Sequence, residues 1–239
     1  MAINNSVFLR QHLLYPVLFL MAASFAIIHF NIDMRLEDYF YALQGHSWAW
    51  KNSWVAEALL HKGGRELSIF LGAIVICALC LSLFLKSQSH IRKPLAYLFL
   101  AVAGASPLVG LLKASLDISC PWEFGRYGGA LSYVDVIQQL HLRNGEGCFP
   151  AAHASAGYSW VALYFFGLFF QSRLRWLGLA GALGCGILFG FTQQIRGAHF
   201  LSHDLWSLAV CWFYSLSVYL VFSHSYVKNH IRIRMPVNA

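Results

Sequence analysis

The sequence is poor in charge. Aspartate, glutamate, lysine and arginine make up only 11% of its 239 residues, whereas a typical soluble domain carries about 25%. So few charges could not keep a protein surface hydrated, which excludes an ordinary soluble globule and a disordered chain. Cysteine is also sparse, because six residues spread over the chain do not make the disulfide scaffold of a small secreted domain. Hydrophobic residues reach 58% and the mean hydropathy is +0.56, as in proteins that the lipid bilayer surrounds.

Long apolar runs are present instead. A helix that crosses a membrane needs about 17–25 mostly apolar residues. Six segments approach or reach this length: Leu13–Phe30, Leu67–Leu85, Leu95–Leu112, Ala151–Phe170, Leu177–Thr192 and Leu205–Ser223. The fifth is short and rich in glycine, which favours close packing against other helices. The sequence therefore predicts an all-α fold, a polytopic bundle of six transmembrane helices. Because repeats and linkers are missing, we expect a single membrane-embedded domain over residues 1–239.

Acidic residues are missing from every second connection between these segments. With the N-terminus inside, the inner connections and the two terminal segments together hold nine basic residues and no acid, and the outer connections hold all ten acids. Lysine and arginine concentrate on the cytoplasmic side of membrane proteins, so both termini are predicted to be cytoplasmic. The net charge of +7 then reflects topology and indicates no nucleic-acid partner.

The two long outer connections carry patterns of their own. In residues 31–66, Leu36, Tyr39, Phe40 and Leu43 have helical spacing, which predicts an interfacial helix that caps the bundle. Residues 113–149 are expected to contain a short surface helix near Ile137.

Three groups of residues lie where predicted helices end on the outer side: Lys113 after the third segment; Ala151, Ala152 and His153 at the start of the fourth; and Arg196, His199, His203 and Asp204 before the sixth. Ionisable residues at the edge of the hydrocarbon layer are candidates for function. Because all three groups fall on one predicted membrane face, we expect them to meet.

The start of the fourth segment has the features of an anion site. Pro150 is favoured at the first helical position, where unbonded amides and the helix dipole attract negative charge. The small side chains of Ala151 and Ala152 would let an anion reach the backbone, and His153 could protonate it. A structural role for His153 is the alternative.

The segment before the sixth helix allows three interpretations. If it is helical, His199 and His203 lie one turn apart on one face. Asp204 could then orient a histidine, and Arg196 could bind a phosphate oxygen. Two histidines and an aspartate could also ligate zinc, although the glutamate of the His-Glu-x-x-His pattern is missing. A purely structural polar cluster is the third interpretation.

Together these residues resemble the signature of the type 2 phosphatidic acid phosphatase superfamily, membrane phosphatases related to vanadium haloperoxidases. The family signature is Lys-x6-Arg-Pro, then Pro-Ser-Gly-His, then Ser-Arg-x5-His-x3-Asp. Here Lys113 precedes a Cys-Pro pair at 120–121, the second part reads Pro-Ala-Ala-His at 150–153, and the third falls on residues 196–204. The signature region, residues 113–204, keeps the family order.

The chain departs from this signature in its first two parts. Cys120 stands at the position of the first arginine, and Ala151 stands at the position of the serine. Arg126 is the first candidate substitute for the missing phosphate ligand, and Arg143 is the second. These departures indicate a divergent subgroup.

The third part can be aligned in two ways. If His199 is the family nucleophile, Gln193 occupies the arginine position, with Arg196 one turn later. His203 then occupies the aspartate position, one residue before Asp204. In the other alignment His203 is the nucleophile.

The resemblance implies a reaction that needs neither metal nor cofactor. His199 would attack phosphorus and form a phosphohistidine while Asp204 orients it, and His153 would protonate the leaving group. Lys113 and Arg196 would bind the phosphate oxygens. The implied substrate is a lipid phosphate at the periplasmic face of the inner membrane, such as lipid A, undecaprenyl pyrophosphate or a phosphoglycerolipid. A lipid phosphotransferase, an inactive scaffold and a transporter are the alternatives.

Two cysteines belong to the signature region. Cys120 and Cys148 lie in one outer connection, in a compartment that permits disulfides. We predict that they pair and tie the first signature part to the second, rather than remain two free thiols. In the chain-entropy model, a disulfide that closes a loop of this length stabilises the fold by about 3–4 kcal/mol.

Overall fold

The computed structural model describes residues 5–52, 54 and 63–234. The first four and last five residues, to which the prediction of cytoplasmic termini refers, lie outside this range. The predicted all-α fold is confirmed. Apart from an isolated bridge between Phe124 and Leu131, the described residues form helices, turns and loops.

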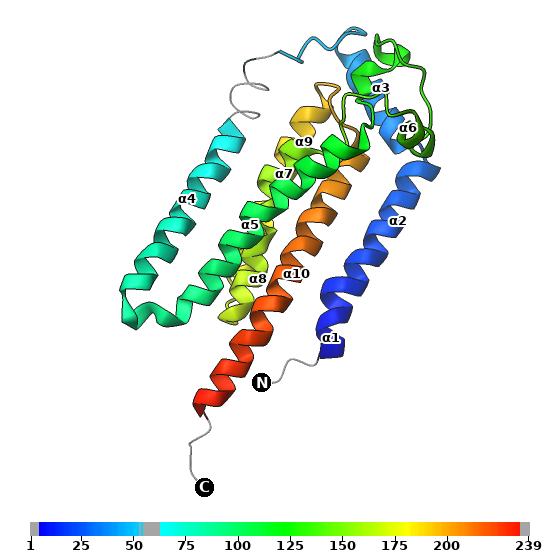
Figure 1. Ribbon diagram of the computed structural model, residues 1–239. Helices are drawn as coiled ribbons and strands as arrows, with labels where there is room; N and C mark the ends of the chain where they lie inside the picture. The colour runs from blue at the N-terminus through cyan, green and yellow to red at the C-terminus, as the bar shows by residue number, and fades with distance from the viewer. Residues whose placement is uncertain (1–4, 53, 55–62, 235–239) are drawn as a thin grey trace.

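Helices run side by side in one bundle (Figure 1). In chain order they are α1 (Asn5–Leu9) and α2 (Tyr15–His29), joined by a π-helical turn, then α4 (Gly63–Phe84), α5 (Ser89–Leu116), α7 (Ala152–Tyr158), α8 (Ala162–Phe169), α9 (Arg175–Gln194) and α10 (Leu201–Arg234). Among the described residues, five helical stretches are long and apolar enough to cross a membrane. The fourth predicted span consists of α7, a 3₁₀ turn and α8, each too short alone. The count of six spans therefore stays a prediction.

The fourth predicted span lies at the centre of the core. Val161 and Phe165 are fully buried, as is Ala105 of the neighbouring helix α5. Gly157 of α7 faces Gly186 of α9 so closely that a side chain at Gly157 would collide with the α9 backbone. The predicted close packing of the glycine-rich fifth segment is thus confirmed at Gly186, and it fixes the end of α7 against α9.

Apolar side chains cover the outside of the bundle. Phe19 and Phe25 on α2 and Phe70 and Phe84 on α4 are each more than 60% exposed. A soluble protein would bury such side chains, whereas hydrocarbon tails solvate them. The helices therefore fit a multi-pass membrane protein.

The end of the bundle opposite α1 is closed by a cap that contains α3 (Ile32–Leu43) and α6 (Val136–Leu142) (Figure 1). Both predicted surface helices are thus confirmed. The buried face of α3 differs from the one that its apolar spacing predicts. Tyr39 and Leu43 are exposed, whereas Phe40 and the acidic Glu37 are buried. We call this end of the bundle the capped end.

Candidate active site

Main-chain hydrogen bonds bring the three signature segments together at the capped end. The Cys148 amide donates to the Ile118 carbonyl (2.6 Å), which joins the first segment to the second. The Trp122 amide donates to the Gly197 carbonyl (3.0 Å), and the Ala151 amide donates to the His203 carbonyl (3.1 Å). Each segment therefore contacts both of the others, as the sequence predicts.

A disulfide strengthens the first of these junctions. Cys120 and Cys148 are bonded, with their Cα atoms 5.2 Å apart, which confirms the predicted pairing. Glu123 supports the same junction, since its carboxylate accepts from the amides of Cys120 (2.6 Å) and Glu146 (3.1 Å). The side chains of Cys120, Glu123 and Cys148 also form a cluster with metal-ligand spacing, but cysteines joined in a disulfide offer no thiolate to an ion.

Three histidines lie next to one another inside this junction. The ring centroid of His199 is 6.4 Å from that of His153 and 5.7 Å from that of His203. His199 is 2% and His203 3% exposed, whereas His153 and Lys113 are half-buried. A ligand would therefore reach His199 from the side of His153 and Lys113.

Burial and positive neighbours determine the protonation of His199. Burial lowers the pKa of its imidazole well below the usual 6.5, and His203, Lys113 and His153 lower it further. The ring is consequently neutral at physiological pH, the form in which an imidazole is a nucleophile.

His199 lies in a loop and not on a helix, contrary to the helical alternative considered for this segment. Helix α9 ends at Gln194 and α10 begins at Leu201. Gly197 between them has a φ of +71°, a left-handed conformation that side chains disfavour. The indole of Trp48 covers Gly197 at the distance where a side chain would collide. The loop at residues 195–200 therefore has a fixed shape.

Residues from the cap bind this loop. The Gln44 side chain donates to the Ile195 carbonyl (2.8 Å), and the Asp33 carboxylate accepts from the Ser202 amide (2.9 Å) at the start of α10. The Trp50 amide in turn donates to Gln44 (2.9 Å). Asp33 and Gln44 are not apparent as site residues from the sequence, because their partners are more than 140 positions away and no local spacing signals them.

Arg196 is turned toward the cap. Its guanidinium donates to the Lys51 carbonyl (2.7 Å) and to the Gln193 side chain (3.2 Å). Gln193, which occupies the family arginine position in the alignment that makes His199 the nucleophile, is 3% exposed. Arg196 and Gln193 thus form a buried pair beside the histidine loop.

Asp204 faces α9. Its carboxylate accepts from the Gln194 side chain (2.5 Å) and lies against Gly190, where a side chain would collide with it. Nδ1 of His199 has no hydrogen-bond partner among the described residues. The structure therefore shows Asp204 joining α10 to α9, and the expected hydrogen bond from His199 to Asp204 is not among its contacts.

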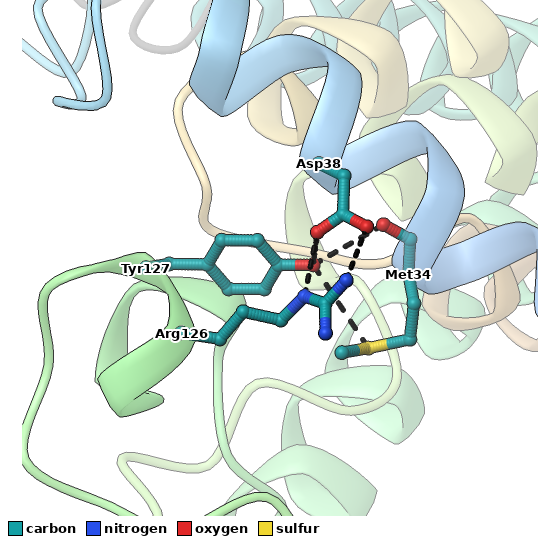
Figure 2. A network of polar contacts seen from close by, with 4 residues as sticks. All are labelled: Met34, Asp38, Arg126 and Tyr127. Atoms are coloured by element: carbon teal, nitrogen blue, oxygen red, sulfur yellow. Dashed lines mark hydrogen bonds and ion pairs between the residues drawn. The ribbon is translucent and has the colours of Figure 1, made fainter.

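Arg126, the candidate replacement for the first signature arginine, forms a pair with Asp38 of α3 (Figure 2). Its Nε and one terminal nitrogen contact the two carboxylate oxygens at 2.6 and 2.5 Å, and the Tyr127 hydroxyl donates to the same carboxylate (3.1 Å). These hydrogen bonds from Arg126 lower the pKa of Asp38. The pair is solvent-accessible, and it joins the loop before α6 to α3.

The start of α7 differs slightly from the expected anion site. Ala151 precedes the helix, and its amide is already bonded to His203. Pro150 therefore lies two positions before the first helical residue. The first intrahelical hydrogen bond of α7 runs from the Ser155 amide to the Ala151 carbonyl, so the amides of Ala152 and Ala154 belong to the unbonded first turn.

Comparison with known families matches the description PAP2 superfamily to residues 94–226, more than half of the chain. The chain belongs to the PAP2 superfamily. In the same comparisons no curated protein and no solved structure gave a match. The matched region of this PAP2 superfamily member includes residues 113–204, in which Cys120 and Ala151 depart from the family signature. Because PAP2 superfamily members are phosphatases, membership suggests phosphoric-ester hydrolase activity on a lipid phosphate.

Proposed function

We propose that the protein is a membrane lipid phosphatase that works through a phosphohistidine on His199. The observation that carries this proposal is the position of His199, a buried imidazole between His153 and His203 whose pKa is lowered by burial and by positive neighbours that include Lys113. Phosphoryl transfer requires a nucleophile, charge neutralisation and a proton for the leaving group. His199 would supply the nucleophile, Lys113 the neutralising charge and His153 the proton.

The proposed reaction has two steps. A ring nitrogen of His199 attacks phosphorus, the bond to the leaving oxygen breaks, and His153 transfers a proton to that oxygen. Water then attacks the phosphohistidine, phosphate leaves, and the proton from water returns to His153. Lys113 and the first-turn amides of α7 stabilise the negative charge on the transferred group.

His199 is a better candidate for the nucleophile than His203. The ring of His203 packs against those of Phe149 (5.3 Å) and Phe200 (5.4 Å), and its carbonyl accepts the Ala151 amide. These contacts give His203 a positioning role. The ring of His199, in contrast, faces that of His153 across 6.4 Å, a spacing into which a phosphate oxygen fits.

The substrate class follows from where the site lies. The histidines are at the capped end of a bundle with an apolar surface, so a substrate with its tail in the bilayer would present its phosphate at this level. The distribution of basic residues supports a position of the capped end on the periplasmic side of the inner membrane. Lipid A, undecaprenyl pyrophosphate and phosphoglycerolipid phosphates all have this geometry.

The test uses purified protein, EDTA and lipids with a radiolabelled terminal phosphate. Release of free phosphate from a lipid substrate supports the hydrolase, and acid-labile label on the protein supports the phosphohistidine. Transfer of the label to a second lipid would instead identify a phosphotransferase. Turnover that EDTA abolishes would overturn the metal-free route, and absence of turnover with all three lipid classes would favour a scaffold or transporter.

A further inference from the structure

A cavity of about 710 Å³ lies among α2, α9 and α10, apart from the histidine cluster. Its volume falls in the range of about 300–1,000 Å³ typical of ligand pockets. Most of its lining is apolar, including Leu183 of α9 and Ala209 of α10. Phe19 and Trp176 line it and are more than half exposed, so it opens sideways toward the surrounding lipid.

The polar groups of this cavity gather at its end remote from the active site. Arg175 is the first residue of α9, and Gln194, which binds Asp204, is the last. A helix of this length extends about 30 Å. Beside Arg175 lie Tyr164 and His12, whose hydroxyl and Nε2 are hydrogen-bonded to each other (2.9 Å).

Arg175 has unused hydrogen-bonding capacity at this position. Its guanidinium carbon lies 5.9 Å from the ring centroid of Tyr164 and 5.6 Å from that of Trp176. Its Nε is buried and has no hydrogen-bond partner among the described residues. A buried donor without an acceptor is costly, and phosphate is the acceptor that guanidinium groups bind best.

We propose that this cavity is a second lipid site, which binds an anionic glycerophospholipid with its phosphate at Arg175 and an acyl chain along the apolar wall. Two features support an anionic membrane lipid over other occupants. The opening faces the bilayer, and basic pockets between transmembrane helices bind anionic headgroups. The bound lipid lies with its headgroup at the end opposite His199, so it is distinct from the substrate and its binding does not depend on turnover.

The experiment is native mass spectrometry of the full-length protein with phosphatidylglycerol or phosphatidylcholine of identical chains. We expect at least fivefold more retained phosphatidylglycerol, and no bound anion with inorganic phosphate alone. Arg175→Gln should remove this preference. Arg173→Gln, an exposed arginine in the same connection, is the matched control and should keep it.

A second variant tests the apolar half of the site. Ala209→Phe fills part of the cavity without changing Arg175, and it should lower retention of phosphatidylglycerol. The proposal is overturned if the wild type does not discriminate between the lipids, if Arg175→Gln keeps the preference, or if Arg173→Gln loses it equally. It is also overturned if Ala209→Phe binds phosphatidylglycerol as the wild type does.

Discussion

His199 is the residue on which the proposed chemistry depends. We expect His199→Ala to lower kcat/KM for a lipid phosphate about 10²–10⁴-fold. His203→Ala should have the smaller effect, because the His203 ring packs against Phe149 and Phe200 and would position the cluster without contacting the substrate. Phosphate release measures both variants, and thermal midpoints show that each is folded. The reverse order of effects would make His203 the nucleophile.

Glu37 is a buried acid that lowers the stability of the folded protein at high pH. It is 1% exposed, and neither carboxylate oxygen has a hydrogen-bond partner among the described residues. Burial raises its pKa well above the usual 4.5, and Asp33, Asp204 and Asp38 raise it further. The folded protein therefore keeps a proton that the unfolded chain loses above about pH 4.5, so stability falls as pH rises.

Replacement of Glu37 should remove this pH dependence. We expect Glu37→Gln to raise the thermal midpoint relative to the wild type by at least about 2 °C more at pH 8 than at pH 5, equivalent to roughly 1 kcal/mol. Thermal unfolding in detergent at the two pH values gives the measurement. An offset between variant and wild type that is the same at both pH values would show that Glu37 ionises freely in the folded state.

At the scale of elements, the contact between α9 and α10 depends on the absence of a side chain at Gly190. A methyl group there would collide with the Asp204 carboxylate, so Gly190→Ala should destabilise the protein by about 1–3 kcal/mol and reduce activity. Gly184→Ala on the same helix is the control, because nothing lies within 4 Å of the added atom. Thermal midpoints of the two variants should differ by several degrees, and equal midpoints would contradict the tight contact.

The helices could be predicted from the sequence because the bilayer fixes both their length and their polarity. The contacts that shape the site could not. Asp33 and Gln44 bind backbone groups more than 140 residues away, and such partners have no periodic spacing. The irregular loop around His199 has no local sequence signal for a related reason, since Trp48, which packs on the left-handed Gly197, is about 150 positions away in the chain. Residue types and chain order identified the three signature segments, but only the folded cap shows which side chains Arg126 and Arg196 contact.

At the scale of the whole molecule, the disulfide is expected to carry part of the stability of the capped end. Cys148→Ser should lower the free energy of unfolding by about 3–4 kcal/mol in the chain-entropy model. Thermal unfolding with and without reductant provides the measurement, and the variant should no longer respond to reductant. Peptide mapping of the oxidised wild type that finds Cys120 and Cys148 unlinked would contradict the bond.

The three signature segments are joined largely through amides and carbonyls, which every amino acid except proline supplies in full. Such joints place no demand on the side chain of residue 151, whereas Cys120 adds a covalent bond between side chains. A substitution at position 193 would replace the side chain that accepts from Arg196, and an arginine at position 120 would sacrifice the covalent link to Cys148. Change at these two positions therefore breaks different joints: a hydrogen bond to the neighbouring guanidinium at position 193 and a disulfide at position 120.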